Sequence, residues 1–86
     1  MKVIISRQAE ADIEEIALFL AAHGLPTALR FENGVRDVIR KLDLFPKRYP
    51  AVEENPNLRR ALFQRWSIIY SIIESEQVVW IERVMR

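Results

Sequence analysis

The apolar residues in the first half of the chain recur every three or four positions, and this helical period is interrupted only once. One stripe consists of Ala9, Ile13, Ile16, Ala17 and Leu20, and the next of Ala28, Phe31, Val35, Ile39 and Leu42. Gly24 and Pro26 stand between the stripes, where a glycine suits the end of one helix and a proline the first turn of the next. So short a link predicts an antiparallel helical hairpin.

Local signals mark the outer limits of this hairpin. Ser6 precedes the first stripe and is a suitable N-cap, and Phe45-Pro46 ends the second helix. Gly34 lies inside the second helix, where glycine costs about 1 kcal/mol relative to alanine. It is either a weak point or a place where the two helices approach closely.

The second half of the chain is rich in β-branched and aromatic residues, which strands prefer. We expect strands at 58–63, 66–73 and 77–84, a polar turn at 74–76, an irregular loop at 47–57, and a short first strand at 2–5. The predicted order is β-α-α-β-β-β over one domain, 1–86. Short polar links imply antiparallel neighbours, so the class is α+β, with the helical hairpin packed on a small twisted antiparallel sheet.

Several kinds of chemistry find no support in the sequence. His23 is the only histidine and there is no cysteine, so neither a nucleophile triad nor a metal site is expected. The two glycines are too far apart for a phosphate-binding loop, and no cofactor is predicted. The apolar start is too short for a signal peptide and no run reaches the length of a membrane span, so we expect a cytoplasmic protein that does not contact membranes.

Arginine and aromatic residues dominate what remains: Arg59, Arg60, Arg65, Trp66, Tyr70, Trp80, Arg83 and Arg86. Such a set can hold phosphates and stack bases, or it can form the centre of a protein interface. Adjacent residues of a strand point to opposite faces. We therefore expect one of Arg59 and Arg60 to tie the sheet edge to a nearby acid or carbonyl, and the other to face a partner. Tyr70 is expected in the core and the tryptophans at least partly buried.

The stretches "SRQAEADIEEIALFLAAHG", "PTALRFENGVRDVIRKLDLFP", "LRRALFQRWSIIYSII" and "QVVWIERVM" occur in this order over nearly the whole chain. This ordered set resembles the ParE/RelE superfamily of bacterial toxins, the toxin halves of type II toxin–antitoxin systems. The resemblance implies a helical hairpin on a twisted antiparallel sheet. It also implies one of two activities. RelE-like members cut mRNA on the ribosome without a metal, whereas ParE-like members trap DNA gyrase on cleaved DNA.

Two positions favour the ParE-like branch. In RelE an arginine precedes the strand triplet that is Ile68-Ile69-Tyr70 here, but this chain has Ser67 at that place. RelE also has a basic tail after its last strand, which has no counterpart after Val84. Arg60 does fall near a basic position of RelE, but a phosphate clamp needs several preorganised donors.

The resemblance therefore predicts a ParE-like toxin that inhibits DNA gyrase, without catalytic residues. A ParD-like ribbon-helix-helix antitoxin would neutralise it and alone would contact operator DNA. The target-binding candidates are Arg59, Arg60, Arg65, Trp66, Trp80, Arg83 and Arg86, and the antitoxin-binding candidates are Leu18, Phe19, Val38 and Leu44. One alternative is a ribosome-dependent, metal-independent mRNA endoribonuclease using Arg60, Arg65 and Arg83 or Arg86. Another is an interaction module without toxicity.

Overall fold

The computed structural model describes residues 1–86 and has the α+β class that the sequence predicts. Its elements are β1 (Lys2–Ile5), α1 (Arg7–Ala21), α2 (Leu25–Lys41), β2 (Ala51–Val52), β3 (Asn55–Phe63), β4 (Trp66–Ile73), a 3-10 turn η1 (Glu74–Glu76) and β5 (Val78–Met85). The helical hairpin, the first strand and the last three strands are confirmed. The segment expected to be an irregular loop contains the short strand β2 and the start of β3.

The five strands form one sheet in the order β1-β5-β4-β3-β2. Strands β2 to β5 are antiparallel neighbours, as short turns require. Strand β1 differs, because it runs parallel to β5 at the edge of the sheet. The helical hairpin follows β1 in the sequence and precedes the other four strands. The last of these, β5, pairs with β1. The sheet is therefore mixed rather than purely antiparallel.

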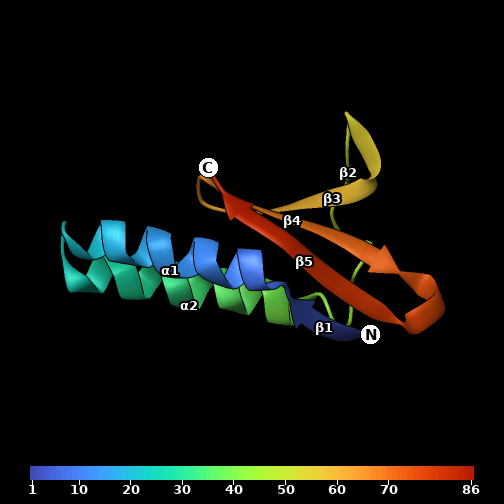
Figure 1. Ribbon diagram of the computed structural model, residues 1–86, viewed down its shortest axis with the longest axis horizontal. Coiled ribbons are helices and arrows are strands. Elements are labelled where there is room, and N and C mark those ends of the chain that lie inside the picture. Colours follow the sequence, from blue (N-terminus) through green and yellow to red (C-terminus); the bar gives the residue numbers. More distant parts are fainter.

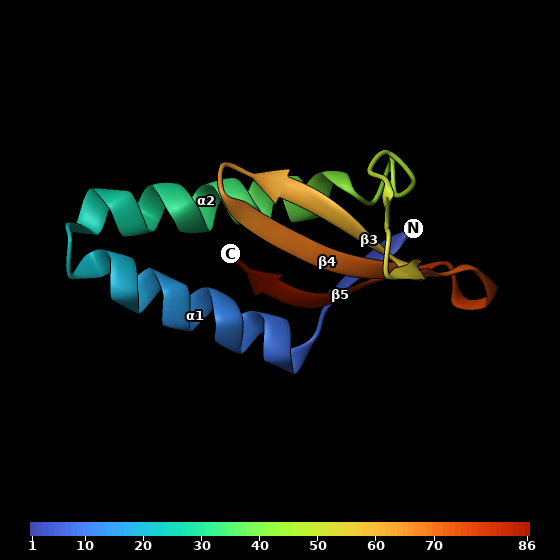
Figure 2. The ribbon, with the colours of Figure 1, turned by 90° about the horizontal axis from the view of Figure 1, so that it is seen from above.

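The helices form one layer and the sheet a second (Figure 1). In this view the sheet is inclined to the helices, so that the β3–β4 turn and the C-terminal end of β5 stand away from them. Figure 2 shows that the tip of the helical hairpin extends beyond the sheet. The core lies between the layers and consists of Ala9, Ile13, Phe31, Val35, Ile39, Leu42, Ala61, Trp66, Ile68, Tyr70, Val79, Ile81 and Val84. The stripes of both helices contribute to it, as expected.

The predicted cap at the start of α1 is present. The Ser6 hydroxyl accepts a hydrogen bond from the Ala9 backbone N–H at 3.0 Å, and it donates one to the Glu82 carbonyl of β5 at 3.1 Å. Helix α1 thus begins at a residue that also touches the last strand. Gly24, expected to cap the end of the first helix, is instead the N-cap of α2, because α1 has Ala22 as its C-cap. Gly24 has a φ of +138°, which side-chain-bearing residues rarely adopt, and Pro26 lies in the first turn of α2. The turn between the helices can therefore be very short.

Gly34 allows a close approach, but not the approach of the two helices to each other that the sequence suggested. A methyl group at this position would lie 2.0 Å from the ring carbon Cζ of Phe63 in β3. The glycine therefore allows the sheet, not α1, to approach α2 closely. Phe63 fills the space that a side chain on α2 would otherwise take.

Neither helix is long and apolar enough to cross a membrane. No three histidine, cysteine, aspartate or glutamate side chains are grouped so that they could hold a metal ion.

Candidate partner-binding site

Arg59 stabilises the loop that follows α2. Its guanidinium Nη1 donates to the carbonyl oxygens of Tyr49 and Lys47, and the Tyr70 hydroxyl donates to the Pro46 carbonyl at 2.6 Å. One of the two adjacent arginines was expected to bind a carbonyl at the sheet edge, and Arg59 does so. Because its donor group is engaged within the chain, Arg59 is less suited than an exposed arginine to contact a target.

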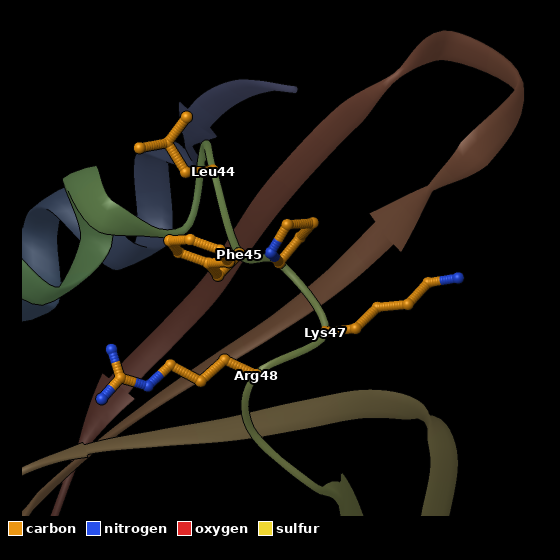
Figure 3. A pocket seen from close by; sticks show the side chains of 5 residues that line it. Leu44, Phe45, Lys47 and Arg48 are labelled. Carbon is orange, nitrogen blue, oxygen red and sulfur yellow. The ribbon is translucent and has the colours of Figure 1, made fainter.

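The same loop carries two large exposed apolar side chains (Figure 3). Leu44 is 74% exposed and Phe45 is 63% exposed. They line an open cavity of about 620 Å³ with Pro46, Lys47 and Arg48. Figure 3 shows Lys47 and Arg48 pointing in opposite directions from the loop. Leu44, expected to contact the antitoxin, is therefore accessible, and the loop that carries it is held by hydrogen bonds.

Arg83 is also engaged within the chain. Its Nε donates to Asp12 Oδ2 at 2.8 Å and its Nη2 donates to Oδ1 at 3.2 Å. Asp12 Oδ2 additionally accepts the backbone N–H of Val84 at 2.9 Å, and Gln8 donates to Oδ1. Asp12 is buried, whereas the Arg83 side chain is half exposed. Arg83 therefore joins β5 to α1, and its charge is partly neutralised.

The electrostatics of Asp12 follow from these contacts. Burial alone would raise the pKa of this carboxyl group, because it disfavours the charged form. The hydrogen bonds from Arg83, Val84 and Gln8 outweigh burial and hold the pKa below its ordinary value of 3.8. The carboxylate is therefore charged at neutral pH. In turn, Asp12 raises the pKa of Arg83.

Arg60 and Trp80 occupy other positions on the sheet. Arg60 is exposed and lines a cavity of about 360 Å³ beside β2, together with Leu62 and Glu54. Trp80 is half buried in β5, where its register neighbours are Ile4 and Ser71. The structure does not bring either residue together with Arg65 or Arg86 in one cavity.

Arg65, Trp66 and Arg86 come together in a groove between the helical hairpin and the β3–β4 turn. We call it the tip groove; it has a volume of about 340 Å³ and its lining includes Phe19, Arg30, Phe31, Arg65, Trp66 and Arg86. Trp66 is nearly buried, and its ring meets Phe31 edge-on, with centroids 5.1 Å apart. This is the partial burial expected for Trp66. The groove unites candidates for target binding with Phe19, a candidate for antitoxin binding.

Apolar side chains also cover the exposed tip of the hairpin. Leu18 is 76% exposed and Phe19 is 62% exposed, so neither belongs to the core. Leu25 and Leu29 on α2 are exposed as well. Val38 differs from the other antitoxin-binding candidates, because it is half buried and packs against the core. Its side chain is therefore only partly available to a partner.

Sequence reasoning missed Arg30, Leu25, Leu29 and Phe45. Leu25 and Leu29 are four residues apart and lie off the buried stripe of α2. Their position in the sequence could therefore have indicated that they are exposed. Arg30 carried no comparable signal. It becomes a groove residue only because the β3–β4 turn and the end of β5 lie opposite it.

Residues 3–86 match the family model described as the ParE toxin of the type II toxin–antitoxin system parDE. Among solved structures, the chromosomal ParDE toxin–antitoxin system of P. aeruginosa is similar, with a TM-score of 0.86 and 20% identity, covering 100% of this chain and 95% of that one. The RelBE2 toxin–antitoxin complex of Mycobacterium tuberculosis has a TM-score of 0.59 and 23% identity, covering 99% and 95%. No curated protein matches by sequence.

Proposed function

Because the chain belongs to the ParE toxin family of type II toxin–antitoxin systems, we propose that it inhibits DNA gyrase and is neutralised by a ParD-like antitoxin. The family match extends over nearly the whole chain. The chain would act as a binding protein that holds gyrase on cleaved DNA. The antitoxin would be the component that contacts operator DNA.

The distribution of the arginines carries this proposal. Arg60, Arg65 and Arg86 are exposed and form no ion pair within the chain, whereas Arg59 and Arg83 are engaged. The free arginines lie beside apolar and aromatic side chains, which is the composition of protein-interface hot spots. We propose that they, and not Arg59 or Arg83, contact the target.

The same distribution weighs against the mRNA endoribonuclease. As stated from the sequence, that activity needs Arg60, Arg65 and Arg83 or Arg86 to converge on one phosphate, because electrostatic stabilisation depends on several groups acting at one position. Arg60 lines a cavity beside β2, away from Arg65 and Arg86 in the tip groove. Arg83 shares a further cavity with Arg86, but it is paired there with Asp12. The arrangement therefore supports protein binding better than phosphate cleavage.

A supercoiling assay with purified, antitoxin-free protein tests the proposal. We expect inhibition of gyrase and the appearance of linear DNA trapped on the enzyme. Charge reversal at Arg60, or at Arg65 and Arg86 together, should abolish gyrase inhibition if the reversed residues contact gyrase. Arg7→Glu is the matched control, because Arg7 is exposed at the start of α1, outside both cavities.

Two results would contradict the proposal. If a large excess of protein leaves supercoiling unchanged, gyrase is not the target, and ribosomes programmed with mRNA become the next substrate to test. If inhibition occurs but survives reversal at both clusters, the contact residues are wrong while the target stands.

A further inference from the structure

We propose that the open edge of β1 pairs with the same edge of a second copy of this chain, so that the two sheets join into one continuous sheet. The two β1 strands would run antiparallel across a two-fold axis, with Ile4 of each copy on the axis. Such self-association is independent of gyrase and of the antitoxin.

The two edges of the sheet, β1 and β2, are protected to different degrees. Strand β2 is only two residues long, follows Pro50, and has an irregular register with β3 between Ala51 and Val52. Short strands, prolines and register irregularities are features that keep a sheet edge from pairing with another chain. Strand β1 has four regularly paired residues without proline or bulge, and Lys2 is its only charged residue. It is therefore the edge that is able to accept another strand.

The backbone of β1 presents hydrogen-bonding groups to this open side. The Lys2 and Ser6 N–H groups donate to carbonyls in or directly before β5, at 3.1 and 3.0 Å. Backbone groups alternate in direction along a strand, so those of Ile4 also face β5, whereas those of Val3 and Ile5 face away from the sheet. Val3 and Ile5 thus each offer one donor and one acceptor to a further strand.

These directions define one symmetric register. In an antiparallel pair, two opposite residues whose backbone groups face each other exchange both N–H···O=C bonds. Val3 of one copy would exchange two bonds with Ile5 of the other, and the two-fold axis would repeat this pair. Ile4 then lies opposite Ile4 of the second copy, and Lys2 lies opposite Ser6. No like charges lie directly opposite each other, an arrangement that would be destabilising.

One unpaired cation and one unpaired anion lie at opposite ends of β1. Neither Lys2 nor Glu82 forms an ion pair within the chain. Glu82 lies beside the end of β1, because its carbonyl accepts the Ser6 hydroxyl. Its carboxylate accepts the Ser71 hydroxyl at 3.3 Å, and Ser71 follows the buried Tyr70, so the carboxylate is on the face away from the helices. The strand register puts Lys2 on this same face.

The charges at the two ends of β1 identify a second copy as the occupant of the edge. An antiparallel two-fold arrangement brings each end of one β1 to the opposite end of the other. Lys2 of one copy would then be two strand spacings, about 10 Å between backbones, from Glu82 of the other. Only the short Ser6 lies between them, so the two long side chains can meet, once on each side of the axis.

Cysteine cross-linking tests the register directly, because the chain has no cysteine of its own. Ile4→Cys would place the two thiols opposite each other, and mild oxidation of the purified chain should give a covalent dimer on a nonreducing gel. Lys2→Cys is the matched control. Its two copies would lie four residues, about 13 Å, apart along the strands, too far for a disulfide, so it should stay monomeric on the gel.

Sedimentation over a range of concentrations measures the affinity of the dimer. Val3→Pro removes an outward donor without removing a bond to β5, and should weaken the dimer by about tenfold or more, whereas Val3→Ala keeps the donor and serves as its control. Lys2→Glu should weaken the dimer about fivefold, and the exchange Lys2→Glu/Glu82→Lys should restore it to within about threefold. Thermal unfolding of each variant checks that it is folded, and Lys2 is exposed, so its reversal tests the pairing even if the proline variant unfolds.

Three results would reject the inference. The first is an unaltered chain that stays monomeric up to roughly 1 mM. The second is equal cross-linking of Ile4→Cys and Lys2→Cys, or a dimer that resists both Val3→Pro and Lys2→Glu, since self-association would then use another surface. The third is a monomer whose binding to the antitoxin is weakened by Val3→Pro, which would give the β1 edge to the antitoxin. None of these measurements involves gyrase, so each result leaves the proposed target standing.

Discussion

The Asp12 carboxylate on α1 joins the Arg83 guanidinium and the Val84 backbone of β5, so that one buried acid connects the helical hairpin to the last strand. Strand β1 pairs with β5 only as far as Ile81, and Asp12 accepts the Val84 N–H just beyond this point. The Asp12 side chain thus provides the hydrogen-bond acceptor that a neighbouring strand would otherwise provide for the Val84 N–H. This contact also holds the end of β5 that leads to the tip groove.

Replacing Asp12 with alanine should therefore destabilise the fold. The change leaves the Val84 N–H without its acceptor, and an unsatisfied buried donor costs about 2 kcal/mol. Urea unfolding followed by circular dichroism measures the loss. Glu14→Ala is the control, because Glu14 is exposed on the same helix and should change stability little. Equal effects of the two substitutions would show that the Asp12 contacts contribute nothing specific.

The stability should also fall in acid. Hydrogen bonding to Arg36 lowers the pKa of Glu10 below 4.5, and that of Asp12 is held below 3.8. A lowered pKa means that the unfolded chain binds more protons, so the stabilisation is present above these ordinary values and is lost as pH falls through the folded ones. Urea unfolding between about pH 7 and about pH 3 should show this loss, and Asp12→Asn should reduce its size. A pH profile unchanged in the Asp12→Asn variant would contradict the assignment.

The parts of the fold that depend on neighbouring residues were predictable from the sequence. The Ser6 cap, the break at Gly24 and Pro26, and the polar turn at Glu74–Glu76 each rest on residues close in the chain. The partners of Arg59 and Arg83 were not predictable. Asp12 and Arg83 are 71 residues apart, and no local pattern marks such a pair.

The candidate site was predictable only in its residue types. The sequence showed arginine and aromatic residues of the kind that binding interfaces contain. Which arginines bind partners within the chain and which do not depends on tertiary contacts. The tip groove needs α1, α2, the β3–β4 turn and the end of β5 together. For the same reason Arg30 could not be distinguished from other surface arginines, and the parallel pairing of β1 with β5 could not be read from short links.

The Gly34→Ala substitution should lower the stability of the natural chain but raise the stability of a Phe63→Ala variant. In the natural chain, Gly34→Ala places a methyl group 2.0 Å from Phe63 Cζ, so the ring must move and stability should fall. In a Phe63→Ala background the obstacle is absent, and the same change should stabilise by about 1 kcal/mol through helix propensity. Thermal unfolding of the four proteins forms a double-mutant cycle. Gly34→Ala stabilising in both backgrounds would mean that the Phe63 ring yields freely.

The Tyr70 hydroxyl should contribute to the order of the loop after α2. Burial raises the pKa of Tyr70, so the phenol stays protonated and donates to the Pro46 carbonyl. Tyr70→Phe removes this bond alone and should cost about 1 kcal/mol, with faster amide exchange at Arg48 and Tyr49. Tyr49→Phe, which keeps the hydrogen bond between the Tyr70 hydroxyl and the Pro46 carbonyl, serves as the comparison. Unchanged exchange in the Tyr70 variant would show that Arg59 suffices to hold the loop.

Leu18 and Val38 should separate antitoxin binding from folding. Leu18 is 76% exposed, so Leu18→Gln should change the free energy of unfolding by less than about 0.5 kcal/mol while weakening the complex with the antitoxin several-fold. Val38 packs against the core, so Val38→Ala should instead cost stability, about 1 kcal/mol, with a smaller effect on affinity. Calorimetric binding and urea unfolding of both variants test the contrast. If Leu18→Gln leaves affinity unchanged, the hairpin tip lies outside the antitoxin interface, and its exposed leucines need another explanation.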